Sequence, residues 1–127
     1  MVEALAATAF VAIGVMGFAA NSVSLTRSGK TADSTSAAHA LAQQTLEQLR
    51  STPLGAAQVN PSNYADAANP LKADGTVGGP FTRTWTVSVN DVPAWGLRTV
   101  TVTVAWTDSK AHSTTLAAYV RCSNIPC

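Results

Sequence analysis

The chain has 127 residues, of which 46% are hydrophobic and 12% are charged, and its formal net charge is +1. This length fits one domain, and the charged fraction is about half the ~25% typical of soluble proteins. A near-neutral chain gives no electrostatic reason to expect nucleic acid or a strongly acidic protein as its partner. Part of the apolar content is therefore expected to face lipid or other subunits.

The N-terminal part of the chain is uncharged over residues 4–20. A helix of this length measures about 25 Å, just short of the ~30 Å hydrocarbon thickness of a bilayer, and its extension through Leu25 would span a membrane. We therefore predict that residues 1–25 form the transmembrane half of a helix. No basic region precedes it, so an ordinary secretory signal is not indicated. Gly14 and Gly17 allow either close helix packing or a local loss of helix.

Glu3 stands at the head of this apolar run, where a carboxylate is costly unless it is paired or lies near the interface. Two interpretations are open: Glu3 lies in the headgroup region, or it pairs with a cation supplied by another molecule. Arg27 and Lys30 follow the run, and a positive-inside count would place that side in the cytoplasm. A basic leader, removed from in front of Met1, would reverse this orientation.

Apolar residues then recur at spacings of three and four, which predicts an amphipathic helix over residues 26–52. The apolar stripe comprises Ala38, Leu41, Ala42, Leu46 and Leu49. The helix is expected to end before Pro53, which has no N–H to donate and disfavours a helical conformation at Thr52. Together the two segments predict one continuous helix from near Met1 to about Arg50.

Residues 53–80 contain Gly, Pro, Asn and Asp at short intervals and are predicted to form a connecting loop. Tyr64 and Leu71 are the apolar residues expected to anchor this loop on the rest of the domain. From Phe81 onward the apolar period changes to two, which is typical of strands. Residues 81–127 are therefore predicted to form a sheet domain.

Three antiparallel strands are predicted in that domain, each with one apolar face. The expected faces are Trp85, Val87 and Val89; Val100, Val102, Val104 and Trp106; and Thr114, Leu116, Ala118 and Val120. One face of the meander is expected to pack on the helical stripe and the other to meet solvent. The predicted fold class is α+β, with a long N-terminal helix on a small three- to four-stranded antiparallel sheet.

Two cysteines, Cys122 and Cys127, lie close together in a polar C-terminal tail. Their spacing favours a disulfide, whose short loop would contribute about 2 kcal/mol and whose stability implies an oxidising compartment. The alternative is a pair of free thiols. A zinc site needs about four ligands, and the remaining candidates, His39 and His112, are far apart in the sequence.

The sequence contains no glycine-rich phosphate loop, no nucleophile elbow and no clustered set of His, Asp and Glu. It therefore predicts no catalytic residue, no metal and no cofactor. Arg83, Arg98 and Arg121 are expected on the solvent face of the sheet, with Trp95 in a nearby turn, as a weak candidate for binding DNA or a surface. Scattered solubilising charges are the simpler interpretation of the same residues.

Taken together, these features resemble the superfamily of type IV pilins and type II secretion pseudopilins. The resemblance is carried by Met-Val-Glu-Ala-Leu at residues 1–5, AHALAQQTLEQLRS at residues 38–51, Trp-Thr-Val-Ser at 85–88 and Val-Thr-Val-Ala-Trp at 102–106. It covers nearly the whole chain. The helix and strand segments are most similar to minor pilins of the V class and minor pseudopilins of the I class.

The resemblance implies a structural subunit of a type IV pilus-like filament, most like a minor pilin that primes assembly or sits near the tip. Its alternatives are a minor pseudopilin of a type II secretion system, a major pilin, or a filament-borne module that binds DNA or a surface. The implied partners are other pilin subunits and a prepilin peptidase, which removes a basic leader and methylates the new N-terminus. The implied location is the bacterial inner membrane, as a single span with the C-terminus outside, and then an extracellular or periplasmic filament.

The resemblance also assigns roles to individual residues. Glu3 would compensate the terminal ammonium of a neighbouring subunit, although the family glutamate lies later in the mature chain than Glu3 does. This difference implies that a leader and the first mature residues are missing from this sequence, or that its start differs. The residues implied in helix packing within the filament core are Leu5, Phe10, Ile13, Gly14, Gly17 and Phe18.

Overall fold

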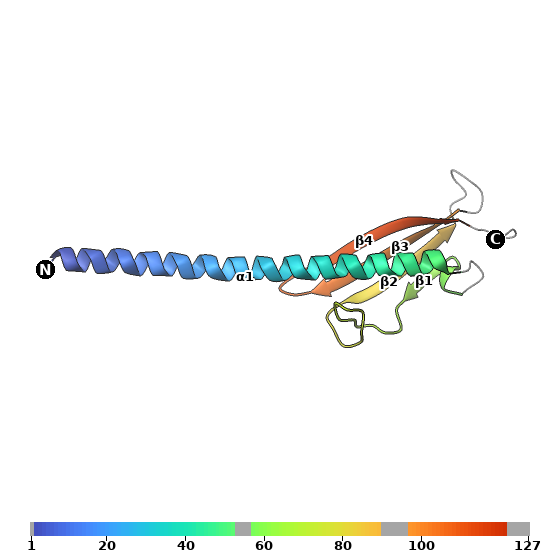
Figure 1. The fold of residues 1–127 in the computed structure, drawn as a ribbon, viewed down its shortest axis with the longest axis horizontal. Helices are drawn as coiled ribbons and strands as arrows, with labels where there is room; N and C mark the ends of the chain where they lie inside the picture. Colours follow the sequence, from blue (N-terminus) through green and yellow to red (C-terminus); the bar gives the residue numbers. More distant parts are fainter. Residues whose placement is uncertain (1, 53–56, 90–96, 122–127) are drawn as a thin grey trace. The chain divides into compact units, whose positions relative to one another are not determined.

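A computed structural model describes residues 2–52, 57–89 and 97–121 of the chain. One long helix, α1 (Val2–Ser51), is followed by a single 3-10 turn, η1 (Ala57–Val59), and a four-stranded sheet. The strands are β1 (Ser62–Ala65), β2 (Thr82–Val89), β3 (Leu97–Thr107) and β4 (Ala111–Arg121), as labelled in Figure 1. The predicted α+β class, with a long N-terminal helix and an antiparallel sheet, is confirmed.

The chain divides into two compact units, residues 1–33 and residues 34–127, and α1 contributes to both. The helix continues through Gly14 and Gly17 without a break, in agreement with the predicted continuous helix. Its end is closed locally, because the Thr52 N–H donates to the Leu49 carbonyl (3.3 Å) and the Thr52 hydroxyl donates to the Gln48 carbonyl (2.7 Å). These bonds satisfy carbonyls that the last helical turn leaves without partners.

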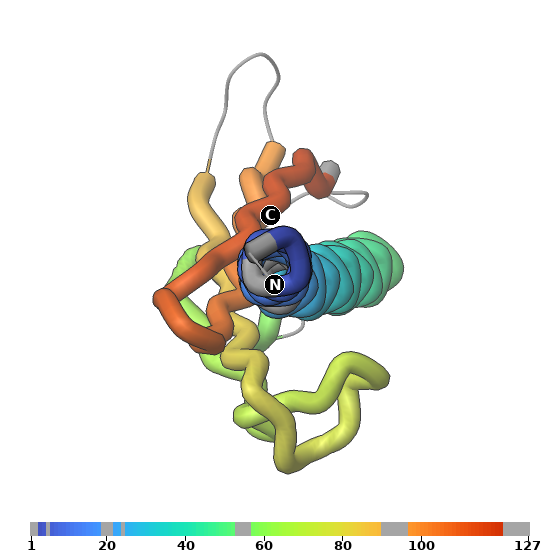
Figure 2. Tube along the Cα trace, turned by 90° about the vertical axis from the view of Figure 1, so that its left-hand side faces the viewer, coloured from blue at the N-terminus to red at the C-terminus, as the bar shows by residue number. Residues whose placement is uncertain are grey.

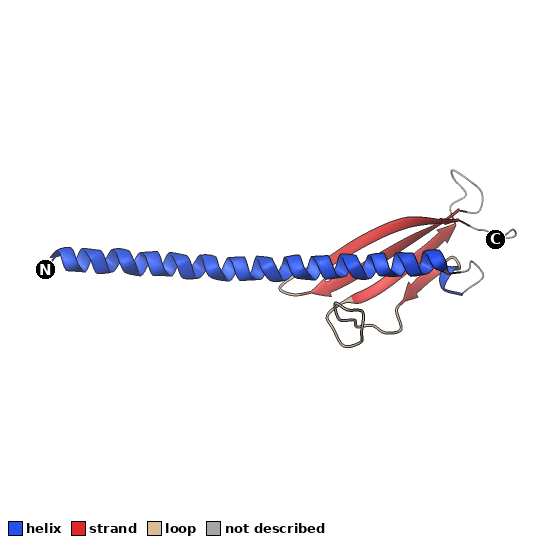
Figure 3. Cartoon of the chain, viewed as in Figure 1, coloured by secondary structure: helices blue, strands red, loops and turns tan. Residues whose placement is uncertain are grey.

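The sheet runs in the order β1-β2-β3-β4, and every neighbouring pair is antiparallel (Figure 3). Val87 of β2 lies opposite Val100 of β3, which in turn lies opposite Ala118 of β4. The three predicted strands are therefore present and form the predicted meander. The fourth strand, β1, lies within residues 53–80, so that segment is more than the connecting loop predicted for it.

The core of residues 34–127 forms where one stripe of α1 meets one face of the sheet. Its buried apolar side chains are Ala38, Leu41, Ala42, Leu46 and Leu49 from α1, with Val59, Leu71, Phe81, Val87, Val100, Val102, Val104, Trp106 and Val120. Trp85, Leu116 and Ala118 are partly buried against this cluster. The predicted helical stripe and the predicted apolar strand faces thus meet each other, except that Val89 is exposed.

The segment between β1 and β2 closes over the core, and Figure 2 follows it in yellow-green as it returns to the start of β2. Leu71 is fully buried and forms isolated β-bridges with Val77 and Phe81. Tyr64 stacks on Trp85 with ring centroids 5.5 Å apart. Both residues act as the anchors that the sequence predicts. A Cβ at Gly79 would lie 2.1 Å from the Leu71 carbonyl oxygen, so only glycine fits there.

The sequence predicts a transmembrane segment within residues 1–25, but no helix in the described part of the chain has the length and apolar character needed to cross a membrane. The predicted disulfide between Cys122 and Cys127 lies outside the described residues.

Removal of residues 1–33 is expected to leave a folded domain, because all buried apolar side chains in the described chain lie between Ala38 and Val120. The fragment should unfold cooperatively, with a Tm within roughly 4–8 °C of the full chain, which corresponds to about 1 kcal/mol for a domain of this size. Circular dichroism during heating measures both transitions. Leu41→Ala in the same fragment is the control and should cost about 2–5 kcal/mol. A fragment without a cooperative transition would contradict the division into units.

Candidate functional site

The first candidate site is the uncharged part of α1 between Glu3 and Arg27. Its large apolar side chains point into open space. Those described, with their exposed fractions, are Phe10 (76%), Val11 (66%), Ile13 (68%), Val15 (63%), Met16 (74%), Phe18 (77%), Val23 (53%) and Leu25 (72%). Monomeric soluble proteins rarely expose continuous apolar surface on this scale, and such surface marks a site of contact with other molecules.

These side chains surround the helix instead of forming one stripe. Phe10, Val11 and Ile13 lie within one turn of each other at steps of about 100° per residue and so point in different directions. A helix that is apolar all round is buried on all sides in its working environment. Gly14 and Gly17 add two notches to this surface, since a Cβ built at either position meets no atom within 4 Å. Small residues of this kind let another helix approach closely.

The described side chains among the predicted packing residues are all exposed to solvent. Phe10, Ile13 and Phe18 are exposed, and Gly14 and Gly17 are open, whereas the Leu5 side chain is not described. Glu3 is exposed in the first turn of α1. A carboxylate there is favoured by the partial positive charge of the helix N-terminus, so the position of Glu3 is compatible with both interpretations made from the sequence.

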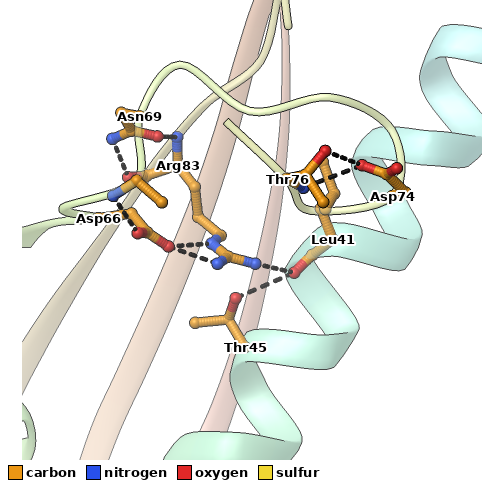
Figure 4. Close-up of polar contacts among 8 residues, drawn as sticks. Leu41, Thr45, Asp66, Asn69, Asp74, Thr76 and Arg83 are labelled. Atoms are coloured by element: carbon orange, nitrogen blue, oxygen red, sulfur yellow. Dashed lines mark hydrogen bonds and ion pairs between the residues drawn. The ribbon is translucent and has the colours of Figure 1, made fainter. Parts of the chain in front are cut away.

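The second candidate site is a polar cluster that links the sheet to α1 (Figure 4). Arg83 extends from β2, and its Nε donates to the Asp66 Oδ2 at 2.8 Å, while its Nη2 contacts the same oxygen. Its Nη1 donates to the Leu41 carbonyl oxygen of α1 at 3.4 Å. The same carbonyl accepts the hydroxyl of Thr45 at 3.0 Å. One arginine therefore bridges the helix backbone and a carboxylate in the segment after β1.

A second pair of hydrogen bonds holds the backbone of this arginine. The Arg83 N–H donates to the Asn69 Oδ1, and the Asn69 Nδ2 donates to the Arg83 carbonyl, both at 2.8 Å. The side chains of Arg83 and Asp66 are 11% and 16% exposed, respectively. A nearly buried ion pair is tolerated only when further hydrogen bonds satisfy its remaining groups, and the Leu41 carbonyl and the Ala68 N–H supply these bonds.

The carboxyl of Asp66 titrates differently from a free aspartate. Burial by itself would raise its pKa, but hydrogen bonds from the Ala68 N–H and the Arg83 guanidinium, together with the positive charge of Arg83, lower the pKa below its usual value. The Asp66 carboxyl is therefore ionised at neutral pH.

The prediction that three arginines share the solvent face of the sheet is wrong for two of them. Arg83 and Arg98 are 9% and 8% exposed, and the Arg98 Nη1 donates to the Val59 carbonyl oxygen. The side chain of Arg121 and all of Trp95 lie outside the described parts. Arg98 alternates with Val100 and Val102, so the two-residue period already placed it on the buried face.

Asp66 was missed by sequence reasoning, although a signal for it exists. Arg83 alternates with Trp85 and Val87 and so belongs to the buried face of β2. A buried arginine needs an anionic or carbonyl partner, and Asp66 is an acidic residue close to Tyr64, the expected anchor. The two histidines remain apart from this cluster: His39 is exposed, and His112 stacks on Trp106 with ring centroids 5.3 Å apart.

In residues 2–52, 57–89 and 97–121, no three residues among His, Cys, Asp and Glu lie close enough together to hold a metal ion. Comparisons of the chain with models of known protein families, with curated proteins and with solved structures find no match.

The polar cluster is expected to act in folding. Arg83→Met would leave Asp66 nearly buried without its cation, and loss of one partner of such a pair costs about 3–5 kcal/mol. Glu47→Gln is the matched control, because its pair with Arg50 is 52–73% exposed and such pairs contribute about 0–1 kcal/mol. Urea unfolding of both variants measures the difference. Equal free energies of unfolding for Arg83→Met and Glu47→Gln would contradict a structural role for the cluster.

Stability is also expected to depend on the charge of Asp66. Because its folded-state pKa is lowered, its contribution is present above the unfolded pKa of about 3.9 and is lost as the pH falls through the lower folded pKa. Asp66→Asn should therefore be less stable than the parent at pH 7 and lose less stability on acidification below pH ~4.

Asp74→Asn is the control for this titration. Asp74 is exposed, and its pKa is lowered by hydrogen bonds from the Thr76 side chain and backbone, with no contribution from Arg83. Urea unfolding between neutral and acidic pH separates the two variants. An unchanged pH dependence in Asp66→Asn would mean that the ion pair does not set acid stability.

Proposed function

We propose that this chain is a structural subunit that assembles with other subunits through the apolar part of α1, in the manner of a type IV pilus-like filament. The observation that carries the proposal is the contrast between the two units. Residues 34–127 bury their own apolar stripe, whereas the described apolar side chains between Phe10 and Leu25 are exposed. The first unit therefore needs cover from outside the chain.

The energetics favour association as the source of this cover. Burying one Val, Leu, Ile, Phe or Met side chain contributes about 1.5–3 kcal/mol. Burial of the whole exposed set is of the same order as, or larger than, the ~4–15 kcal/mol cost of association. The notches at Gly14 and Gly17 favour a neighbouring helix as the covering element.

In the proposed filament the apolar helices bundle in the core and the sheet domains form the outer layer. Glu3 then meets the terminal ammonium of a neighbouring helix. An unpaired charge in an apolar core costs several kcal/mol, so this pairing selects the register of insertion more than it adds net stability. The long helix, its apolar head and the antiparallel meander support this proposal.

Within this class we favour a minor pilin that primes assembly or sits near the tip, because the local sequence resemblance is to minor pilins. Residence in the inner membrane before assembly, leader removal by a prepilin peptidase and a final place in an extracellular or periplasmic filament belong to the same proposal. A minor pseudopilin and a major pilin are its closest alternatives. The genes next to this one, encoding either pilus or secretion components, would separate a pilus from a secretion system.

Glu3→Gln and Glu3→Leu are expected to reduce incorporation into sheared filaments roughly tenfold or more, since a lost pairing of about 1.4 kcal/mol changes an equilibrium tenfold. The sheet domain should fold normally in both variants, because Glu3 lies outside its core. Immunoblots of filament and membrane fractions from the host measure incorporation relative to the cellular pool.

Glu47→Gln, on the exposed side of the same helix, is the control for loss of a carboxylate. Its incorporation should match that of the parent chain. Normal incorporation of both Glu3 variants at normal membrane levels would make Glu3 an interfacial residue only. The charge-pairing role would then be dropped.

A further inference from the structure

The two edges of the sheet are built differently. The β1 edge is short, because β1 has only four residues, Ser62–Ala65, and lies between Pro61 and the paired Asp66. The β4 edge has eleven residues, Ala111–Arg121. Short strands and proline are common ways in which proteins prevent a sheet edge from pairing with another chain. The β1 edge has these features and the β4 edge does not.

The β4 sequence also lacks the other features that usually prevent a sheet edge from pairing with another chain. Between Ala111 and Val120 it contains no Lys, Arg, Asp, Glu, Pro or Gly. Its pairing with β3 runs without a bulge from Thr107↔Ala111 to Leu97↔Arg121. Within the described residues β4 has a strand partner on the β3 side alone. Its outward N–H and C=O groups therefore form a long, regular template for a further strand.

The side chains of β4 also leave apolar surface near this edge. Leu116 and Ala118 point toward the core but are only partly buried, and Tyr119 on the other face is 60% exposed. A strand added beside β4 would cover Leu116 and Ala118 from the open side. Cross-strand pairs of this kind contribute about 0.2–1 kcal/mol each.

We propose that β4 pairs with β4 of a second copy of the chain, antiparallel and about a two-fold axis near Leu116. Length favours this occupant, because a β4 edge matches another β4 over eleven residues, whereas the β1 edge offers only four. Self-pairing about Leu116 sets Leu116 opposite itself, Thr114 opposite Ala118 and Thr115 opposite Ala117. These pairs place no like charges opposite each other, and a two-fold interface requires such self-complementarity.

This pairing goes beyond the proposed filament and does not depend on it. Copies in a helical filament share one direction, whereas a two-fold pair places β4 strands in opposite directions. The paired form is therefore a state outside the filament that competes with assembly. One strand edge buries less than the ~1,200 Å² of a standard stable complex, so the pairing is weak and depends on concentration.

Hydrogen–deuterium exchange of the full chain in detergent micelles tests the pairing. It measures the protection of the β4 amides themselves, separately from any association through the apolar part of α1. At a total protein concentration of about ten times the dissociation constant, roughly a fifth of the chains remain monomeric, so the outward amides of residues 111–121 should exchange roughly fivefold more slowly than in dilute protein. The amides of β1 should show no change with concentration. Sedimentation velocity on the same samples follows the mass.

The test variant is Thr115→Lys with Ala117→Lys, which sets lysines opposite each other across the proposed pair and should abolish the concentration dependence. The control is Thr84→Lys with Ser88→Lys, which adds the same charge to exposed positions of β2, an interior strand, and should retain it. Thermal unfolding establishes that both variants are folded. Exchange of β4 that is independent of concentration in the parent chain, or equally dependent in the test variant, would overturn the pairing. Neither result would bear on Glu3 or on filament assembly.

Discussion

Packing of the α1 stripe against the valines of β3 is the interaction on which the folded domain depends. Leu41 and the side chains of Val100, Val102 and Val104 are almost completely buried, and the other core residues gather around them. Successive side chains of a strand point to opposite faces of the sheet, so this contact determines which face is buried and which meets solvent. The buried stripe of α1 begins at Ala38, and the described large apolar side chains that precede it are exposed.

The polar cluster gives this apolar contact a defined register. Apolar contacts between a helix and a sheet are not directional, whereas the Arg83 guanidinium donates to one carbonyl oxygen of the helix, that of Leu41, at 3.4 Å. Asp66 and Asn69 hold Arg83 from the other side. The cluster thus ties three segments together: the helix, the segment after β1, and β2. Its hydrogen-bond partners all belong to the chain itself, so these bonds serve the fold.

The molecule presents two surfaces that its own described residues do not cover, and they differ in kind. The apolar part of α1 lacks any cover around the helix and offers side-chain packing, while the β4 edge offers backbone hydrogen bonds in one direction only. The first suits the permanent burial of a filament core. The second suits a weak contact that can be released, because its area is small. The proposed filament and the proposed β4 pair would use different surfaces. They would exclude each other only because copies in a filament share one direction, whereas paired copies point in opposite directions.

The sequence by itself determined the long helix, the three long strands and their apolar faces. The three- and four-residue spacing around Leu41 and the two-residue alternation around Val102 are local consequences of helix and strand geometry, and both predicted faces form the core. The same alternation places Arg83 and Arg98 on the buried side, so their expected exposure contradicted a pattern that was present in the sequence. Only the tertiary structure decided the rest. Asp66 pairs with Arg83, and β1 joins the sheet from within a predicted loop, because the chain reverses between Leu71 and Phe81 and brings these segments together. Such contacts depend on the path of the loop in space, and this path cannot be predicted from the spacing or the periodicity of apolar residues in the sequence.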